Sequence, residues 1–452
     1  MKFFHISDLH IGKRVNGFSM LEDQKYILSS ILKLVRENRP DGVWIAGDLY
    51  DKSMPSAEAV ETADWFLSQL AAQNVPAWVI SGNHDSAERV AYAGKMLEQA
   101  GVYVSRIFDG KMQGYCVQKK RGGKVSIVPM KPFSETAILT GNEAEPKKKI
   151  SAANDVQTWA HVPQVCADEE KEERIYIWML PYLRPTQIRR FFPEEQIETT
   201  QQAVAAVLKS SEIPQDGTNV LLMHQFLAGA DVCDSEELSV GGLDQVDVST
   251  VDAFDYVALG HLHRPQSVGR ESVRYCGSPL KYSFSEAGHK KSVTVVEIMP
   301  KGNKRRKDEA WENELRETAP QENELQKKIS VSTLPLVPRL DMREIRGPFE
   351  TIMKKEIYDL ENREDYLHIT LTDQEGILDA IGKLREVYPN IMKLDFAQRD
   401  PSYAIEETEI LIEEKTPQEL FEEFFERQNG RKLSEEQRTV VIDAFEKASE
   451  KQ

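Results

Sequence analysis

The sequence contains few cysteines and no long apolar run. Its four cysteines are scattered and form no C-x-x-C pair; they are Cys116, Cys166, Cys233 and Cys276. This usage fits the reduced thiols of a cytoplasmic protein better than disulfides or a zinc knuckle. No stretch approaches the roughly 18 apolar residues of a membrane-spanning helix, and the amino terminus carries no apolar signal region. We therefore expect a cytoplasmic protein that has no membrane partner.

Two common catalytic motifs are also absent. The sequence has neither a phosphate-binding P-loop nor the nucleophile elbow of Ser/His/Asp hydrolases. We therefore expect that the chain itself does not bind ATP. The formal net charge of −17 disfavours nonspecific DNA binding through the overall electric field. A polyanionic substrate would have to be attracted locally, by metal ions or by a basic groove.

The composition predicts a multidomain α/β protein. The 452 residues are 40% apolar, which is enough for a large core, and their number predicts two or three domains. In the first 100 residues, strand-like segments at 2–7, 42–46 and 76–81 alternate with helical segments at 21–38 and 57–73. Further strands are predicted at 175–180, 219–223, 256–260 and 292–298. Such alternation is typical of helices packed against a parallel sheet.

Shifts in composition divide the chain into modules. We expect a first domain at 1–299 with an insertion at 141–173, a charged linker at 300–333, a small α/β block at 334–400, an acidic linker at 401–415 and two short helices at 416–452. The small block has predicted strands at 366–371 and 391–396 around a helix at 374–387. We expect the charged run to be a solvated linker and not a DNA-binding tail.

Polar residues follow five of the predicted strands directly. They form the motifs D-x-H, G-D-x-x-D, G-N-H-D, a lone His and G-H-x-H, in that order along the chain. The residues of interest are Asp8, His10, Asp48, Asn83, His84, Asp85, His224, His261 and His263. Because open α/β sheets carry their sites beyond the carboxyl ends of the strands, we expect these side chains to meet at one rim.

These residue types suit a site for two divalent metal ions. Asp and Asn offer hard oxygens and His a borderline nitrogen, without any thiolate, so Mn²⁺ is favoured over structural zinc. Two such ions can activate water and stabilise both oxygens of an in-line displacement. Each motif alone occurs by chance, and any single histidine could be a core residue. Their joint occurrence favours phosphoester hydrolysis, and the remaining histidines (His5, His161, His289, His368) are expected to be structural or at the surface.

The motifs resemble those of the calcineurin-like metallophosphoesterase superfamily. Four segments more closely resemble the SbcD family of bacterial nuclease subunits: S-D-L-H-I-G-K at 7–13, A-L-G-H-L-H-R-P-Q at 258–266, R-Y-C-G-S-P-L at 274–280 and S-F-S-E at 283–286. The resemblance implies a calcineurin-like fold, with central sheets flanked by helices, a small α/β capping domain at 334–400 and a C-terminal helical hairpin. The segments at 141–173 and 300–333 are longer than the family usually carries.

The resemblance also implies a role for each motif residue. One metal ion would be held by Asp8, His10, Asp48 and His263, and the second by Asp48, Asn83, His224 and His261. Asp48 would bridge the two ions. His84 would not be a ligand but would stabilise the transition state or protonate the leaving oxygen. Asp85 is expected either to orient His84 or to stabilise the turn.

The two C-terminal helices are predicted from capping boxes, T-P-Q-E at 416–419 and S-E-E-Q at 434–437. The first helix carries Phe421, Phe424 and Phe425 on one side. The residues alone support equally packing against the protein's own core and binding in a partner's groove. The resemblance implies the second, with an SbcC-like ATPase as the partner.

Three classes of function remain open. The leading hypothesis is a Mn²⁺-dependent DNA nuclease subunit, with double-strand exonuclease and single-strand or hairpin endonuclease activity, that acts with the ATPase in DNA repair, recombination and replication. Its substrates would be DNA ends and hairpins. Two copies of the chain would form a homodimer through the helices after Pro55 and Asp85, and this homodimer would be part of a heterotetramer. The alternatives are a small-substrate metallophosphoesterase, either a cyclic-nucleotide phosphodiesterase or a phosphatase, and a noncatalytic DNA-end scaffold.

Overall fold

The structure is a computed structural model of the chain. It describes residues 1–119, 125–130, 174–234, 236, 244–299, 329–359, 362–373 and 377–397, and the pairs 421–422, 433–434, 437–438 and 440–441. The predicted insertion at 141–173 and the acidic linker at 401–415 lie outside the described residues, as does most of the charged linker. No helix within the described ranges is both long and apolar enough to cross a membrane.

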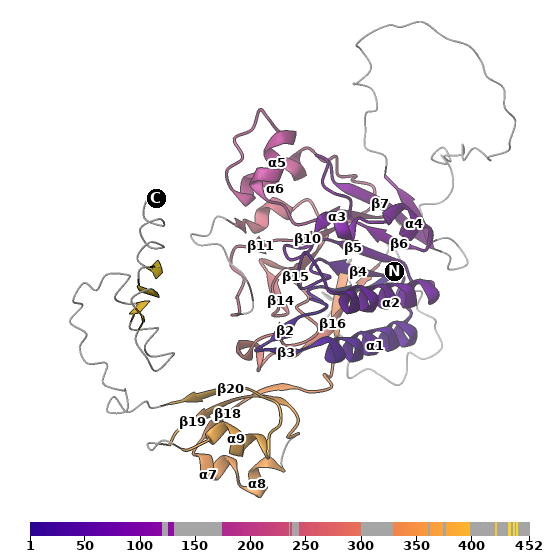
Figure 1. Ribbon diagram of the computed structural model, residues 1–452. Coiled ribbons are helices and arrows are strands. Elements are labelled where there is room, and N and C mark those ends of the chain that lie inside the picture. Colours follow the sequence, from indigo (N-terminus) through magenta and orange to yellow (C-terminus); the bar gives the residue numbers. More distant parts are fainter. Residues whose placement is uncertain are drawn as a thin grey trace, which may run out of the picture.

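A six-stranded sheet contains the amino-terminal strands. Its order is β17-β16-β1-β4-β5-β6, and the last four strands run parallel to one another. The strands are β1 (Lys2–Ile6), β4 (Gly42–Ala46), β5 (Ala77–Ile80), β6 (Val102–Val104), β16 (Ser292–Ile298) and β17 (Ile329–Pro335). Helices α1 (Leu21–Asn38) and α2 (Ala57–Ala72) pack against one face of this sheet (Figure 1). The predicted β-α-β-α-β order is therefore present.

A seven-stranded sheet follows in the order β14-β15-β13-β10-β9-β7-β8. Its strands are β7 (Gln113–Lys119), β8 (Val125–Pro129), β9 (Arg174–Leu180), β10 (Thr218–His224), β13 (Tyr256–Gly260), β14 (Gln266–Val268) and β15 (Arg270–Tyr275). One face is covered by helices, which are α5 (Pro185–Ile188), η1 (Arg189–Phe191), α6 (Thr200–Lys209) and η2 (Val248–Val251). Smaller elements complete the domain: β2 (Arg14–Val15), β3 (Phe18–Ser19), α3 (Ala87–Val90), α4 (Gly94–Gln99), β11 (Phe226–Leu227), β12 (Gln245–Val246) and η3 (Phe284–Glu286).

The two sheets face each other across an apolar core. Large buried rings fill the space between them, among them Phe3, Trp44 and Trp78 from the first sheet and Tyr256 from the second. The ring of His5 on β1 also crosses this space, because Nδ1 lies 3.1 Å from the Tyr256 hydroxyl and Nε2 lies 3.1 Å from the Leu259 carbonyl oxygen. His5 is thus structural, as predicted. This packing holds the strand ends of both sheets at one common rim.

The last strand of the first sheet begins inside the segment predicted as linker. Strand β17 pairs antiparallel with β16 from Ile329 to Pro335. Residues 329–333 therefore belong to the sheet, and the predicted linker boundary at 333 is too late. The charge run ends before this point, and the β-branched residues that follow it supply one more edge strand.

Beyond β17 lies a small α/β domain with its own core. Three parallel strands in the order β18-β19-β20 span Met342–Gly347, Tyr366–Leu371 and Ile391–Phe396. Its helices are α7 (Phe349–Ile352), α8 (Lys355–Tyr358) and α9 (Ala380–Arg385). The helix predicted at 374–387 is wrong in extent, because α9 begins only after Asp379. That residue has a left-handed backbone, and its side chain accepts a hydrogen bond from Gly382 N at 3.3 Å.

The small domain lies below the first domain in Figure 1 and is attached to it through hydrogen bonds to α1. The buried carboxylate of Asp23 accepts hydrogen bonds from Tyr366 Oη at 2.6 Å and Arg339 Nε at 3.0 Å. Leu336, Met342 and Tyr366 also join the apolar cluster beneath α1 and α2. A charge-assisted hydrogen bond and shared apolar contacts therefore fix this domain against the first one.

Candidate metal centre

The strand ends bring all nine predicted residues to one rim. Asp8 and His10 follow β1, Asp48 follows β4, and the Asn83–Asp85 segment follows β5. His224 ends β10, whereas His261 and His263 follow β13 of the other sheet. The carboxylates of Asp8 and Asp48 and the rings of His10, His224, His261 and His263 are buried. Buried ionisable groups at such density require charge compensation.

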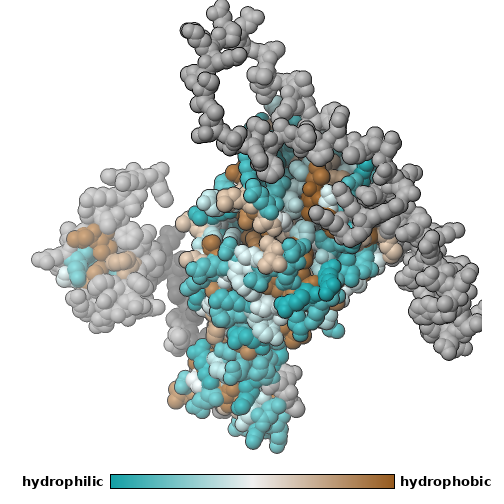
Figure 2. All heavy atoms as spheres, turned by 90° about the vertical axis from the view of Figure 1, so that its right-hand side faces the viewer, coloured by the Kyte–Doolittle hydropathy of each residue, from teal (hydrophilic) through white to brown (hydrophobic). Residues whose placement is uncertain are grey.

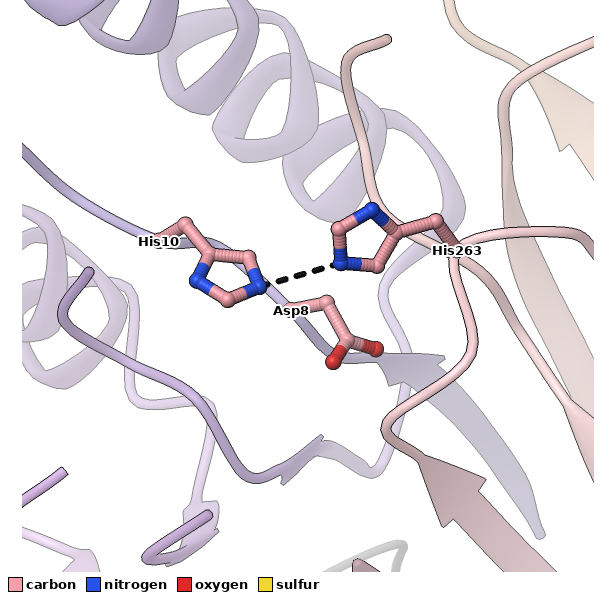
Figure 3. Close-up of side chains that lie close together, drawn as sticks. All are labelled: Asp8, His10 and His263. Carbon is pink, nitrogen blue, oxygen red and sulfur yellow. Dashed lines mark hydrogen bonds between the residues drawn. The ribbon is translucent and has the colours of Figure 1, made fainter. Parts of the chain in front are cut away.

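Asp8, His10 and His263 form a first cluster (Figure 3). The Nε2 atoms of the two histidines lie 3.1 Å apart, and the Asp8 carboxylate lies beside them. One ligand atom from each residue lies within 4.8 Å of those of the other two. Three donors that converge on one point can hold a divalent cation.

Asp48, Asn83, His224 and His261 form a second cluster. Asn83 Oδ1 lies 3.0 Å from both His224 Nε2 and His261 Nδ1. Asp48 Oδ2 lies 3.2 Å from His224 Nε2 and 3.7 Å from His10 Nε2. Asp48 therefore lies between the two clusters, which is the position that a bridging ligand requires.

Hydrogen bonds on the outer side of two rings determine which nitrogen faces the rim. His224 Nδ1 donates to the Ala46 carbonyl oxygen at 2.7 Å, and His263 Nδ1 lies 3.1 Å from Glu286 Oε1. In both rings Nε2 is then the atom left for a metal ion. Such outer partners orient the imidazole and raise its basicity as a ligand.

The buried groups of the site shift one another's pKa values. Burial, the largest effect, raises the pKa of Asp8, and the charge of Asp48 adds to this rise, while His224 and His263 oppose it. Burial also disfavours ionisation of Asp48, but the nearby His224 and His10 hold the Asp48 pKa well below its usual value. Burial lowers the pKa of His261 to about 3. Against the effect of burial, Asp48 raises the pKa of His224 to about 9.

Backbone strain is concentrated at the same residues. Asp8, His10, Asp48 and His261 all have positive φ angles, of 53°, 43°, 49° and 105°. Residues other than glycine rarely adopt this region, and such strain persists only where surrounding structure enforces it. The Asp8 carboxylate contributes to this enforcement, because it accepts hydrogen bonds from His261 N at 3.0 and 3.2 Å.

His84 and Asp85 have different surroundings. His84 Nδ1 donates to the Asp51 carbonyl oxygen at 3.0 Å, and one ring nitrogen lies within 4.8 Å of ligand atoms of His10 and Asp48. The Asp85 carboxylate accepts from three backbone N–H groups, those of Leu49, Tyr50 and Gly82, at 2.9–3.1 Å. This geometry is that of the turn-stabilising alternative for Asp85, and the Asp51 carbonyl is the group that orients His84.

Some residues near the site carried no role in the sequence analysis. Ser7 Oγ donates to the Asp8 carboxylate, and Gln24 Nε2 donates to the His10 carbonyl oxygen at 2.7 Å. Lys13 Nζ lies 2.8 Å from Asp51 Oδ1. Ser7 and Lys13 lie in the motif segment 7–13, and Asp51 ends the G-D-x-x-D motif. These motifs are therefore the signal by which the three residues could have been found. Among the other histidines, His368 contacts Glu344 and Asp395 in the small domain, and His161 lies outside the described residues.

The donor set fits divalent metal ions. Carboxylate, amide and imidazole donors converge without thiolates, and two buried carboxylates lie within reach of several histidines. The residues present therefore suit hard or borderline cations such as Mn²⁺ better than soft ones.

We expect the Gly82→Ala variant to lose metal affinity. A Cβ atom at Gly82 would overlap the Asp48 carboxylate and its backbone nitrogen, so Asp48 would have to move. Titration of the purified chain with Mn²⁺ should show weakened binding at both ions. Gly288→Ala is the matched control, because a Cβ there meets no atom within 4 Å. Normal Mn²⁺ binding by Gly82→Ala would contradict the assigned position of Asp48.

Comparison with known proteins shows the family to which the chain belongs. Residues 1–265 match the calcineurin-like phosphoesterase family, and residues 338–429 match the type 5 capsule protein repressor C-terminal domain. The chain is 30% identical over 444 residues to the SbcD subunit of the SbcCD nuclease of Staphylococcus epidermidis, covering 97% of this chain and 96% of that protein. The phosphoesterase match and the similarity to the staphylococcal SbcD subunit identify the family. The chain belongs to the SbcD family of calcineurin-like phosphoesterases and is a metal-dependent hydrolase of phosphodiester bonds.

Proposed function

We propose that the chain is a Mn²⁺-dependent DNA nuclease that binds two metal ions and acts on DNA ends and hairpins in repair, recombination and replication. The position of Asp48 between the two ligand clusters is the observation that carries this proposal. Asp8, His10, Asp48 and His263 would hold one ion, and Asp48, Asn83, His224 and His261 the other. Such ions supply Lewis-acid activation of water and of the phosphodiester.

The protein's own residues would position and protonate the reacting groups. His84 donates its Nδ1 hydrogen to Asp51, so Nε2 is the nitrogen available at the rim. When the ring is protonated, Nε2–H can donate a proton to the leaving oxygen. Asp85 would act indirectly, because its bonds to three backbone amides hold the turn that carries Asn83 and His84.

A phosphodiesterase for small substrates is the second candidate. The α/β domain that is fixed against α1 favours the nuclease, since hydrolysis of a small substrate needs no second domain. We therefore expect Mn²⁺-dependent cleavage of hairpin and double-stranded DNA, with little activity when EDTA is present. Efficient hydrolysis of bis-p-nitrophenyl phosphate or a cyclic nucleotide without DNA cleavage would favour the second candidate. DNA binding without any cleavage would indicate the scaffold.

We further propose that residues 416–452 bind an SbcC-like ATPase. Two described parts of this region are joined by Arg438, whose Nε and Nη2 donate to the Glu422 carboxylate at 2.8 and 2.6 Å. Both residues are helical, and their ion pair joins the two stretches in which helices are predicted. Phe424 and Phe425 lie outside the described residues. Phe421 is 36% exposed, so part of its ring is open to a partner.

The Phe421→Ala variant is expected to bind the ATPase about 30-fold more weakly. An aromatic hot-spot residue costs at least about 2 kcal/mol when truncated, and 1.4 kcal/mol corresponds to a factor of ten. The dissociation constant can be measured by calorimetry with the full chain and the ATPase. Phe396→Ala is the matched control, since that ring is 42% exposed on β20 of the capping domain. A lowered melting temperature with unchanged affinity would instead support packing against the protein's own core.

A homodimer is proposed on the face that carries α2, α3 and α4. Four large apolar side chains on or beside these helices are exposed: Met54, Val60, Tyr92 and Met96. Figure 2 looks onto this side of the molecule and shows hydrophobic side chains among hydrophilic ones. Exposed apolar surface of this kind often marks an interface. The assembly would then be two copies of this chain with two of the ATPase.

We place the complex in the cytoplasm, since Cys116, Cys233 and Cys276 are free thiols that form no disulfide bond.

A further inference from the structure

A buried ion pair lies directly behind the predicted ligand His263. Glu286 and Lys291 are both buried, and Lys291 Nζ lies 2.5 Å from Glu286 Oε2. The other carboxylate oxygen, Oε1, lies 3.1 Å from His263 Nδ1. Neither charged residue belongs to the two ligand clusters or to the proposed proton transfer.

The remaining contacts of the pair also converge on His263. Lys291 Nζ donates to the His263 carbonyl oxygen at 2.9 Å and to Ser278 Oγ at 2.8 Å. Glu286 Oε1 also accepts from Tyr282 N at 3.2 Å. The ring and the main chain of His263 are therefore both held by one charged network. The motif segments at 274–280 and 283–286 supply Ser278 and Glu286 to this network.

Stability alone does not explain such a network. Removing two charges from water is costly, and a buried ion pair is often no more stabilising than apolar residues of similar volume. A carboxylate on the outer nitrogen of a ligand histidine has another use, because it fixes the tautomer and makes the inner nitrogen a better donor. The direct Glu286–His263 contact meets that geometric requirement.

We propose that Glu286 is a positioning residue for His263, and that Lys291 holds the Glu286 carboxylate in place. Glu286 keeps the His263 Nδ1 hydrogen on the outer side, so Nε2 faces Asp8 and His10. Lys291 neutralises the carboxylate and at the same time binds the main chain of His263. The proposal rests on the metal site described under the proposed function. It adds the residues that hold His263, one ligand of the first ion, in place.

The segment that contains this network also contacts the small α/β domain. Lys281 Nζ lies 2.8 Å from Asp341 Oδ1, and Leu336 N donates to the Lys291 carbonyl oxygen at 2.9 Å. The Phe284 and His368 rings have centroids 5.3 Å apart. A change at Glu286 could therefore disturb domain packing, so a test must separate metal affinity from stability.

Titration of the full chain with Mn²⁺ by calorimetry provides that test. We expect Glu286→Gln, which keeps the side-chain shape but loses the charge, to weaken one of two ions about 10- to 100-fold and leave the other unchanged. The double variant Glu286→Gln with Lys291→Met leaves no unpaired charge, and we expect the same selective loss. Glu297→Gln is the matched control, because that glutamate pairs with Lys2 at 3.6 Å on the protein surface, away from the network.

The outcomes are distinguishable. A one-site loss in both variants at an unchanged melting temperature supports the positioning role. Wild-type affinity in the double variant overturns it, because the single variant then reports only a stranded lysine. If Glu286→Gln does not fold, the double variant alone decides between these results. Failure of the wild-type chain to bind two Mn²⁺ ions would instead count against the proposed metal site.

Discussion

The Asp48→Asn variant is expected to lose nearly all phosphodiester hydrolysis, by at least about 10³-fold. Metal ions in such sites supply several kcal/mol of transition-state stabilisation, and 1.36 kcal/mol is a factor of ten in rate. Asparagine keeps an oxygen that can accept the hydrogen bond which His84 N donates to Asp48 Oδ1 at 2.9 Å. The lost property is therefore the charge that both ions would share.

Metal content and turnover should be measured on the same preparation of the Asp48→Asn variant. We expect fewer than two bound Mn²⁺ ions per chain at concentrations that saturate the wild-type protein. Asp216→Asn serves as the control, since that exposed carboxylate lies just before β10 and contacts Arg174 and Tyr176 on β9. Two tightly bound ions in an active Asp48→Asn variant would rule out the bridging role.

For His84→Asn we expect turnover to fall about 10²- to 10⁴-fold, which is the usual contribution of a positioned acid or base. Binding of Mn²⁺ and of DNA should be retained, because His84 is not assigned as a ligand. The loss should appear in kcat and not in the dissociation constant for DNA. This separation follows from the position of the ring beside the clusters, where it is held through the Asp51 carbonyl.

The alternative for His84 is also accessible to experiment. Its ring nitrogen lies near ligand atoms of His10 and Asp48, so a direct contact with an ion is the competing interpretation. Loss of one Mn²⁺ ion in His84→Asn would establish that interpretation and remove the assigned acid. His289→Asn is a suitable control, because His289 lies outside both ligand clusters.

Much of the site could be predicted because the ligands follow directly after apolar strands. The strands predicted at 256–260 and 292–298 have those same bounds in the structure. Such a run of buried residues is visible in sequence, and the polar residue after it must lie at the end of the sheet. Asp8, Asp48, Asn83 and His224 could therefore be placed at one rim from sequence alone.

Long-range pairing could not be read in the same way. Strand β17 follows a long charged run, and its partner β16 is known only from the fold, so its first residues were assigned to the linker. The contact between His263 and Glu286 joins residues 23 positions apart with no regular period between them. Two turn residues lie directly before α9, so this helix is shorter than the one that its apolar pattern predicts. Each of these features depends on tertiary contacts that override local preference.

Anomalous X-ray diffraction from crystals soaked in Mn²⁺ tests most directly whether two ions bind on either side of Asp48. We predict two anomalous peaks that share the Asp48 carboxylate. One peak should lie among Asp8, His10 and His263, and the other among Asn83, His224 and His261. A single peak, or two peaks of which only one contacts Asp48, would contradict the account.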